Sequence, residues 1–192
     1  MRHLRIQISP IFCIYLCIVL LLFPIKWVIS WIIAAAFHEL CHAIVIKSCG
    51  LQIDRVQLHI GGATIHTQIS SSKKELICAI AGPIGSALLL LFIRVWPELS
   101  FCGLVQCVFN LLPIYPLDGG RALRCLVELI VGKQQLDIVM LWVDRITLSI
   151  ISILSVYVSL QYEIGLLPII VTTTLIVKRR NIACKPPHQR VQ

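Results

Sequence analysis

Residues 27–46, with the sequence WVISWIIAAAFHELCHAIVI, decide the fold predicted for this chain. A helix needs about 20 predominantly apolar residues to cross the hydrocarbon core of a bilayer, and this stretch has that length. Apart from one cysteine, its only ionisable side chains are His38, Glu39 and His42. The stretch therefore predicts a membrane-spanning helix with a polar cluster inside the membrane.

The composition of the whole chain indicates a membrane protein. Hydrophobic residues make up 58% of its 192 residues and charged residues 14%, against about 45–50% and about 25% in soluble domains. The apolar residues are gathered into blocks, which predict an all-α polytopic membrane protein with about six transmembrane helices. The predicted spans are residues 6–23, 27–46, 76–96, 99–115, 146–160 and 164–177. We expect one domain over residues 1–180 and a disordered cytoplasmic tail over residues 181–192.

The basic residues test this topology, because cytoplasmic loops of membrane proteins are enriched in Lys and Arg. With the N-terminus in the cytoplasm, 15 of the 17 basic residues fall in cytoplasmic segments, and only Lys26 and Arg94 fall outside. We therefore expect a multi-pass protein of the cell membrane with both termini and the active-site side in the cytoplasm. This placement explains the formal charge of +8, so the lipid bilayer is an expected partner and nucleic acid is not.

The first apolar block resembles a signal peptide, since Arg2 and Arg5 precede it. Residues 24–27 follow in place of a small-residue cleavage site, so we interpret the block as a retained first helix. The nine cysteines form no C-x-x-C pair and lie mostly in apolar runs, where cysteine behaves as a small hydrophobic residue. The sequence therefore predicts no disulfide framework.

Residues 51–70 alternate between apolar and polar side chains around Gly61-Gly62. This pattern predicts a β-hairpin, or short re-entrant loop, between the second and third spans, with a two-residue turn. A turn at Gly61-Gly62 pairs His59 with Thr64. His59 and His66 could form a second metal site, but this register does not pair them and favours ordinary histidines on a polar face.

The H-E-x-x-H motif at residues 38–42 has the spacing of a metal site. Histidines at i and i+4 share one helix face, so the imidazoles of His38 and His42 can both reach one Zn²⁺. Glu39 lies about 100° further round the helix, where it can contact a water on the metal without binding the metal itself. Alternatively these side chains line a helix interface, but ionisable groups inside a bilayer are costly and mark functional sites.

A catalytic zinc usually has three protein ligands and one open position, so a third ligand is expected at the same membrane depth. The second and fourth predicted spans both run from outside to inside. At about 1.5 Å per residue, His38 and His42 lie about 16 and 22 Å below Trp27, and Asp118 lies at most about 26 Å below Phe101. Asp118 is therefore the predicted third ligand, and its alternative role is to N-cap the helix that follows it.

Helix-breaking residues precede and follow this aspartate in NLLPIYPLDGG, residues 110–120. Pro113 and Pro116 remove backbone donors, and broken backbone at membrane depth is tolerated only beside protein or a watered cavity. Hydrolysis consumes water, so such a cavity suits a hydrolase. Asn110 could donate a hydrogen bond to a substrate carbonyl or oxyanion, or it could bond to a neighbouring helix, and the residues leave both open.

HELCH at residues 38–42, together with N-x-x-P-x-x-P-L-D-G-G at residues 110–120, resembles the site-2 protease family of intramembrane metalloproteases. The six-span layout resembles the branch typified by the stage IV enzyme of spore-forming bacteria, which processes a membrane-tethered sigma factor precursor. The resemblance implies one zinc ion per chain, held by His38, His42 and Asp118, with Glu39 as general base. It also implies a metalloendopeptidase that cuts membrane-tethered protein substrates.

Further expectations follow from the resemblance. It implies that the loop at Gly61 and Gly62 binds substrate, which adds as a strand to the edge of the hairpin, and Asn110 is taken as a further candidate substrate contact. Residues 81–83, Ala-Gly-Pro, resemble a family sequence and are expected to allow close helix packing. Cys41 replaces the glycine that the family usually has, and we expect it to pack without binding the metal. A regulatory membrane protein could be a further partner.

Two other functions are considered. A polytopic membrane transporter also uses broken helices and buried ionisable residues, but it is expected to show a structural repeat, and none is found in the sequence. A substrate-binding pseudoprotease is the other, although every expected catalytic residue is present. The sequence shows neither a PDZ-like domain nor a C-terminal nucleotide-sensing domain, so ATP-linked regulation is not implied.

Overall fold

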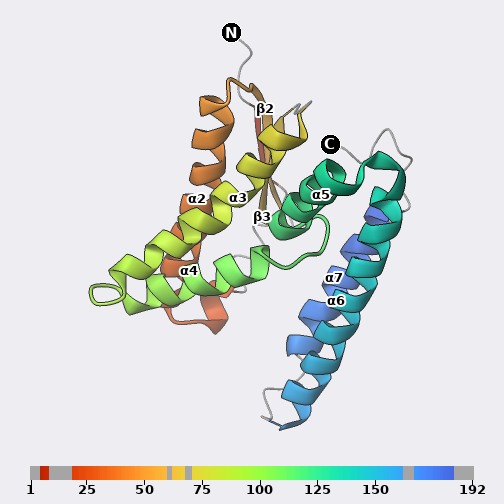
Figure 1. The fold of residues 1–192 in the computed structure, drawn as a ribbon. Coiled ribbons are helices and arrows are strands. Elements are labelled where there is room, and N and C mark those ends of the chain that lie inside the picture. Colours follow the sequence, from red (N-terminus) through yellow and green to blue (C-terminus); the bar gives the residue numbers. More distant parts are fainter. Residues whose placement is uncertain (1–4, 9–18, 60–61, 68–70, 162–166, 184–192) are drawn as a thin grey trace. The chain divides into compact units, whose positions relative to one another are not determined.

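The structure is a computed structural model, and it describes residues 5–8, 19–59, 62–67, 71–161 and 167–183. The chain divides into two compact units, Met1–Leu111 and Leu112–Gln192. Helices account for most of the described residues, and a small sheet lies in the first unit (Figure 1).

Three helices form the body of the first unit. α2 spans Ile25–Ser48, α3 spans Ser72–Leu88, and α4 spans Pro97–Asn110. A short 3-10 helix, η1 (Leu89–Phe92), continues α3 before the chain turns back into α4. Figure 1 shows α3 and α4 as an antiparallel pair, and both helices contact α2.

Small side chains let these helices approach closely at the core of the first unit. The buried cluster comprises Ala34, Leu89, Leu99 and Cys102, with Phe37 and Trp96 packed around it. Near the start of α2, Trp27 makes an edge-to-face contact with Phe101 of α4, with ring centroids 5.7 Å apart. Close packing of small residues is what holds helices together in a bilayer, since lipid tails are as apolar as the side chains.

A three-stranded sheet completes the first unit, with the strand order β1-β2-β3. β1 (Arg5–Ile8) pairs parallel with β2 (Ile53–His59), and β2 pairs antiparallel with β3 (Gly62–Thr67). α2 contacts both β2 and β3. Among the described strands, β2 is therefore central, and β1 and β3 form the two edges.

The register of β2 and β3 differs from the predicted one. His59 pairs with Gly62, and Thr64 pairs with Gln57, so the predicted pairing of His59 with Thr64 is wrong. Gly61 of the predicted turn lies outside the described residues, whereas Gly62 belongs to β3. The two registers differ by a shift of two residues, which leaves every residue on the same face of the sheet. The alternating pattern is therefore compatible with both.

The predicted first span, residues 6–23, is wrong at its start. Residues 6–8 lie in β1, where they pair with residues 56–58 of β2. The strand sequence RIQI alternates between polar and apolar residues, which is the pattern of a strand, but its isoleucines merge with the apolar block that follows. Residues 9–18 lie outside the described residues, and residues 19–22 are helical.

The other helices of this unit test the next three predicted spans. α2 contains the whole of the predicted span 27–46, and α3 with η1 covers most of the predicted span 76–96. The predicted span 99–115 ends too late, because α4 ends at Asn110. Pro113 has no N–H to donate, and helical geometry is disfavoured for the residue before a proline. With its 14 residues, α4 is about 21 Å long.

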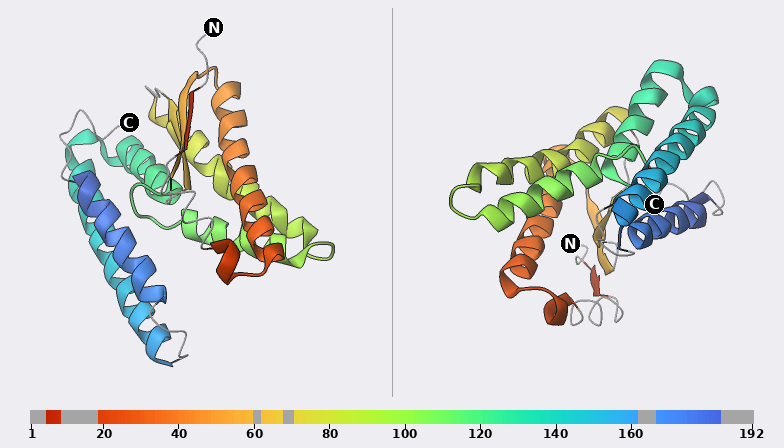
Figure 2. Two further views of the ribbon diagram at one scale, coloured as in Figure 1. Left: turned by 180° about the vertical axis from the view of Figure 1, so that it is seen from behind. Right: turned by 90° about the horizontal axis from the view of Figure 1, so that it is seen from below.

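The second unit consists of three helices. α5 spans Asp118–Val131, α6 spans Lys133–Gln161, and α7 spans Leu167–Ala183. Gly132 separates α5 from α6 with a φ of 85°, a conformation that glycine adopts without strain. Buried Val127 of α5 packs with Leu136 and Met140 of α6. α6 and α7 lie side by side in both views of Figure 2 and are in contact.

Two predicted boundaries in this unit are wrong. The predicted span 146–160 begins too late, because α6 starts at Lys133 and its first half contains Asp137, Asp144 and Arg145. Because of these charges, a search for apolar runs alone does not detect the first half of the helix. The tail predicted to be disordered from residue 181 begins too early, because α7 continues to Ala183. Residues 184–192 and residues 164–166 of the predicted sixth span lie outside the described residues.

Among the described residues, three helical segments are long and apolar enough to cross a membrane: Ile25–Ser48, Ser72–Phe92 and Lys133–Gln161. Pro168–Val177 is a shorter apolar segment. The outward side chains of α6 are apolar as well, since Ile146, Ile150 and Ile153 are 55%, 59% and 71% exposed. A helix that is apolar on its outer face suits lipid and not water. These helices indicate a membrane protein.

Replacing Ala34 with leucine is expected to destabilise the first unit, because Ala34 is fully buried against η1 and α4. Overpacking of a tight core typically costs about 1–3 kcal/mol. Ala36→Leu is the matched control, since Ala36 lies on the same helix and is exposed. The free energy of unfolding, measured in detergent by denaturant titration, should fall for the first variant only. Equal stability of the two variants would contradict the packing of this core.

Candidate metal centre

The two histidines of the H-E-x-x-H motif lie on the buried face of α2. His38 is 3% exposed and His42 is 7% exposed. Their Nε2 atoms lie 3.2 Å apart, and the two rings meet edge to face at 80°. The structure therefore brings the two imidazoles of the motif together at one point.

Helix α3 holds the other nitrogen of each imidazole. Nδ1 of His42 donates a hydrogen bond to the backbone carbonyl of Cys78 at 2.7 Å, and Nδ1 of His38 lies 2.8 Å from the hydroxyl of Ser86. A carbonyl only accepts, so His42 carries its proton on Nδ1 and a lone pair on Nε2. If Nδ1 of His38 likewise donates to Ser86, both Nε2 lone pairs point toward the same place. Such partners fix the tautomer of metal-binding histidines.

Gly82 of α3 makes room beside the two Nε2 atoms. A Cβ at this position would lie 2.6 Å from Nε2 of His38 and closer still to Nε2 of His42. Something would have to shift to accommodate it. The close helix packing predicted at residues 81–83 is therefore confirmed at its glycine, and the space that this glycine leaves opens onto the imidazoles.

The geometry of the histidine pair fits a zinc ion. Two nitrogen ligands of a tetrahedral zinc at about 2.0–2.1 Å lie about 3.3 Å from each other, close to the observed 3.2 Å. When both Nδ1 atoms carry the ring proton, the two Nε2 lone pairs at this separation repel each other, and a cation between them would remove the repulsion. Neutral imidazole is also the commonest metal ligand in proteins. The buried and pre-oriented donors of His38 and His42 therefore match those of a zinc site.

The other two polar residues of the motif lie on neighbouring parts of α2. Glu39 is half-buried, and helical spacing places it about 100° round the helix from His38. Cys41 packs against α3, because a Cβ at Gly85 would lie 2.8 Å from Cβ of Cys41. The thiol thus has the packing contact that the sequence predicts for it.

Asp118 belongs to the second unit and is the first residue of α5, where it is 8% exposed. Its Oδ1 lies 3.8 Å from Nη1 of Arg121, one turn further along the helix. The N-cap residue of α5 is Leu117, and no side chain forms a capping hydrogen bond there. The alternative role of Asp118 as the N-cap is therefore wrong.

The loop before Asp118 folds onto the first turn of α5. Ile114 is 1% exposed, and its carbonyl oxygen accepts the N–H of Leu117 at 2.8 Å. A Cβ at Gly120 would lie 2.5 Å from that carbonyl oxygen and 2.5 Å from the backbone nitrogen of Tyr115. Glycine at position 120 is therefore required for this close approach of loop and helix.

Asn110, the last residue of α4, has a side-chain hydrogen bond within its own helix. Its Nδ2 donates to the backbone carbonyl of Gln106 at 3.0 Å. This bond is neither a contact to another helix nor a contact to substrate, the two alternatives that the sequence leaves open. The role of Asn110 in binding substrate stays a prediction.

The two histidines of the sheet are not neighbours across β2 and β3. His59 pairs with the first residue of β3, and His66 lies four residues further along β3, which corresponds to about 13 Å along a strand. A second metal site formed by His59 and His66 is therefore not supported by this register.

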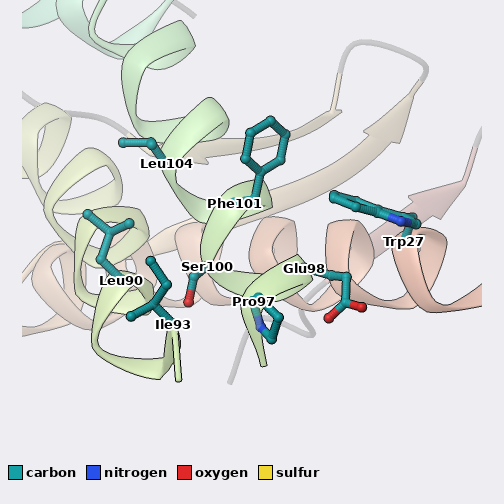
Figure 3. Close-up of a pocket in the computed structure, with 8 residues that line it drawn as sticks. All are labelled: Trp27, Leu90, Ile93, Pro97, Glu98, Ser100, Phe101 and Leu104. Atoms are coloured by element: carbon teal, nitrogen blue, oxygen red, sulfur yellow. The ribbon is translucent and has the colours of Figure 1, made fainter. Parts of the chain in front are cut away.

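A pocket of about 410 Å³ lies elsewhere in the first unit, beside the N-terminal ends of α2 and α4 and the end of η1 (Figure 3). Most of its lining is apolar, with Trp27, Leu90 and Phe101 among the residues that surround it. Trp27 and His38 are separated by about 16 Å along α2. The pocket is therefore distinct from the space beside the imidazoles.

The sequence predicts close packing at Gly82, but it does not identify Cys78 and Ser86, the residues of α3 that bind the histidines. Cys78, Gly82 and Ser86 are spaced by four residues, so they form one stripe along α3, and this stripe contacts His42 and His38. The signal was the i, i+4, i+8 spacing of small residues in an apolar segment. Such stripes mark close contacts between membrane helices, but the spacing does not name the partner helix.

Comparison with known proteins assigns the chain to a class of peptidases. A family model described as Peptidase M50B-like matches residues 11–112, which is more than half of the chain. The chain belongs to this family, as its resemblance to the site-2 proteases predicts. The match includes His38, Glu39, His42 and Asn110, whereas Asp118 lies beyond it. Membership in a peptidase family does not favour the alternative of a transporter.

Individual relatives support the same class. The Zinc metalloprotease MJ0392 of Methanocaldococcus jannaschii is 35% identical over 111 residues, which cover 50% of this chain and 32% of that protein. Stage IV sporulation protein FB of Bacillus subtilis is 30% identical over 134 residues, which cover 62% of this chain and 46% of that protein. The chain thus matches less than half the length of either curated relative.

A solved structure shows the same fold. The Site-2 Protease from Methanocaldococcus jannaschii superimposes with a TM-score of 0.66 at 22% sequence identity, and the match covers 94% of this chain and 91% of that chain. At this level of identity the likeness establishes the fold alone. It covers the helices of both units of the chain.

Replacing Ser86 with alanine is expected to weaken zinc binding, because it removes the partner that orients the ring of His38. Loss of a hydrogen-bond partner behind a metal ligand typically lowers metal affinity by about 10–100-fold. Zinc affinity of the purified protein, measured by competition with a chelator, checks this.

Ser100→Ala is the matched control for Ser86→Ala. Ser100 is similarly buried and has a hydrogen bond of the same length, 2.8 Å, in which its hydroxyl donates to the carbonyl of Leu89 away from the histidines. An equal loss of zinc affinity in both variants would show that the effect of Ser86 is general destabilisation.

Proposed function

We propose that this chain is an intramembrane zinc metalloendopeptidase that hydrolyses peptide bonds of membrane-associated or membrane-spanning proteins. The observation that carries the proposal is the pair of buried Nε2 atoms 3.2 Å apart on α2. Placing two ionisable side chains of an apolar helix inside a bilayer costs free energy unless both bind a shared partner. Membership in the Peptidase M50B-like family supports a catalytic zinc as that partner.

One zinc ion per chain would be held by His38, His42 and Asp118. The histidines supply two neutral nitrogen donors, and a catalytic zinc usually takes a third protein ligand and keeps one position open. Asp118 suits this role because it is a buried carboxylate that follows a loop with two prolines in a membrane protein. The guanidinium of its neighbour Arg121 lies at 3.8 Å, so a cation accompanies this carboxylate.

When bound, zinc lowers the pKa of a water and polarises the carbonyl of the peptide bond to be cut. Glu39 is proposed as the general base. It follows His38 directly on α2, so its carboxylate can take the proton from the attacking water. The same carboxyl group can then pass the proton to the leaving amine, as a general acid. The buried faces of α2 and α3 restrict the surrounding bulk water, which strengthens these charge interactions.

The substrate is proposed to bind in an extended conformation at an edge of the sheet. A helical segment hides its peptide bonds, and an added strand exposes them through main-chain hydrogen bonds. β1 occupies one side of β2 and β3 occupies the other, so a further strand would pair with β3 or β1 and not with β2. Asn110 and the loop at Gly61 and Gly62 are the proposed additional substrate contacts.

The proposed topology has six membrane spans with both termini and the active-site side in the cytoplasm of the cell. Three apolar helices among the described residues are long enough to span, and the distribution of basic residues orients them. The proposed substrate is membrane-tethered, for example a sigma factor precursor as the family resemblance implies, and the chain is similar to a stage IV sporulation protein. A regulatory membrane protein is a further proposed partner.

Replacing Glu39 with glutamine is expected to abolish cleavage and to leave zinc bound. Glutamine keeps the size of the side chain but cannot accept a proton, and general-base catalysis contributes about 10²–10⁴-fold to rate. Cleavage of co-expressed single-span candidate substrates and the zinc content of the purified protein are measured together. A Glu39→Gln variant that cleaves at the wild-type rate would refute the role of this residue.

Replacing Asp118 with alanine is expected to remove zinc as well as activity, because the proposed site would lose one of three ligands. Asp137→Ala is the matched control, since Asp137 lies in the same unit but has a side chain that is 75% exposed and pairs with Arg124. Zinc content by elemental analysis should fall well below one ion per chain for the first variant only. Retention of stoichiometric, tightly bound zinc by the Asp118 variant would exclude Asp118 as a ligand.

A further inference from the structure

A buried ion pair joins α6 to α7 in the second unit. Asp144 of α6 is 3% exposed, and Oδ2 of its carboxylate accepts hydrogen bonds from Nε of Arg179 of α7 at 2.6 Å and from Nη2 of the same side chain. The Arg179 side chain is only 18% exposed. A charge pair removed from solvent to this degree is stable only when its remaining lone pairs are also satisfied.

The second oxygen of Asp144 is directed to the loop before Asp118. Both nitrogens of Arg179 bind Oδ2, so Oδ1 is left to accept another donor. The backbone N–H of Tyr115 donates to this Oδ1 at 3.4 Å. Tyr115 is three residues before Asp118 in sequence, and it belongs to the loop that packs onto α5.

The same loop is held to α5 from its other side. The carbonyl of Ile114 lies against Gly120, and the guanidinium of Arg124 lies 5.9 Å from the centroid of the Tyr115 ring. Residues 112–117 therefore contact α5 through backbone and ring atoms. They contact α6 through the hydrogen bond from the backbone N–H of Tyr115 to the carboxylate of Asp144, which Arg179 holds in place.

We infer that Asp144 and Arg179 form a positioning pair for Asp118. Arg179 orients the carboxylate of Asp144, Asp144 fixes the N–H of Tyr115, and the loop then presents Asp118 at the start of α5. This inference rests on the proposed function, in which Asp118 binds zinc. Neither residue of the pair is a catalytic residue, because each acts through the loop.

A simpler role for the pair would be to hold α6 and α7 together. The two helices have a second polar contact, in which the hydroxyls of Ser155 and Thr172 lie 2.5 Å apart. That contact joins the same helices but does not involve the loop. Loss of the Ser155–Thr172 contact therefore affects only the pairing of α6 with α7, whereas loss of the Asp144–Arg179 pair also affects the loop before Asp118.

The test measures how fast a chelator removes zinc from the full-length protein purified in detergent. In the exchanged variant Asp144→Arg/Arg179→Asp, the ion pair between α6 and α7 is restored, but arginine has no acceptor for the N–H of Tyr115. We expect zinc release at least about tenfold faster than in the wild type, the low end of the effect of losing support behind a metal ligand. Arg179→Lys should release zinc faster than the wild type but more slowly than the exchanged variant, because the cation remains while the paired N–H groups of the guanidinium, which orient Asp144, are lost.

Thr172→Val is the matched control, since it removes the hydroxyl contact between α6 and α7 and leaves the loop untouched. Its zinc release should equal that of the wild type. The inference is overturned if the folded exchanged variant releases zinc at the wild-type rate, or if Thr172→Val accelerates release as much. Should the exchanged variant not fold, Asp144→Leu/Arg179→Met replaces it, because apolar pairs often substitute for buried ion pairs without loss of stability. The same acceleration is expected.

The Asp118→Ala variant separates the failure of this inference from the failure of the proposed function. Because Asp118→Ala is expected to lose zinc, zinc content takes the place of the release rate in this comparison. If the pair acts through Asp118, combining the exchange with Asp118→Ala should lower the zinc content no further than Asp118→Ala alone. If Asp118→Ala loses zinc and the exchange alone does not accelerate release, only the positioning role fails. If Asp118→Ala retains stoichiometric zinc, the proposed ligand set fails, and the positioning role with it.

Discussion

Two imidazoles whose Nε2 atoms meet between α2 and α3 are the constraint on which the first unit depends. Their approach to 3.2 Å requires that each Nδ1 be engaged elsewhere, and α3 supplies both partners through Ser86 and the carbonyl of Cys78. α3 can come this close only because residue 82 has no side chain. In a bilayer the alternative to such pairing is an unsatisfied polar group in hydrocarbon, so helix packing and the polarity of the site are determined together.

The second unit also has to satisfy polar groups in the membrane, and it does so in a loop. Residues 112–117, which include two prolines, have backbone groups without helical hydrogen bonds, and such groups are tolerated at membrane depth only when protein or water surrounds them. The carbonyl of Ile114 accepts the N–H of Leu117, Gly120 lets the loop lie on α5, and the carboxylate of Asp144 accepts the N–H of Tyr115. These contacts hold the irregular backbone before Asp118, and the proposed role of Asp118 as a metal ligand would require such support.

A membrane protease must bring water, a metal and an extended peptide together in a medium that disfavours all three. In the proposed function, the buried polar cluster of the helices inside an apolar shell would meet the first two requirements. The sheet would meet the third, because an extended segment could add to the main-chain groups of its edge strands. The addition of β1 to the sheet restricts such a segment to an outer edge.

The sequence by itself determined the features that are local or nearly so. The H-E-x-x-H spacing places His38 and His42 on one helix face, the apolar runs identify α2 and α3, and the alternation of residues 51–70 identifies strand-forming segments. Only the tertiary structure decided which residues of α3 hold the histidines, the register of β2 with β3, the place of β1 in the sheet, and the pairing of Asp144 with Arg179. Periodicity tells which face a residue occupies, but it is unchanged by a shift of two residues in a strand and does not name the partner across a helix contact, because that choice depends on how segments distant in sequence pack.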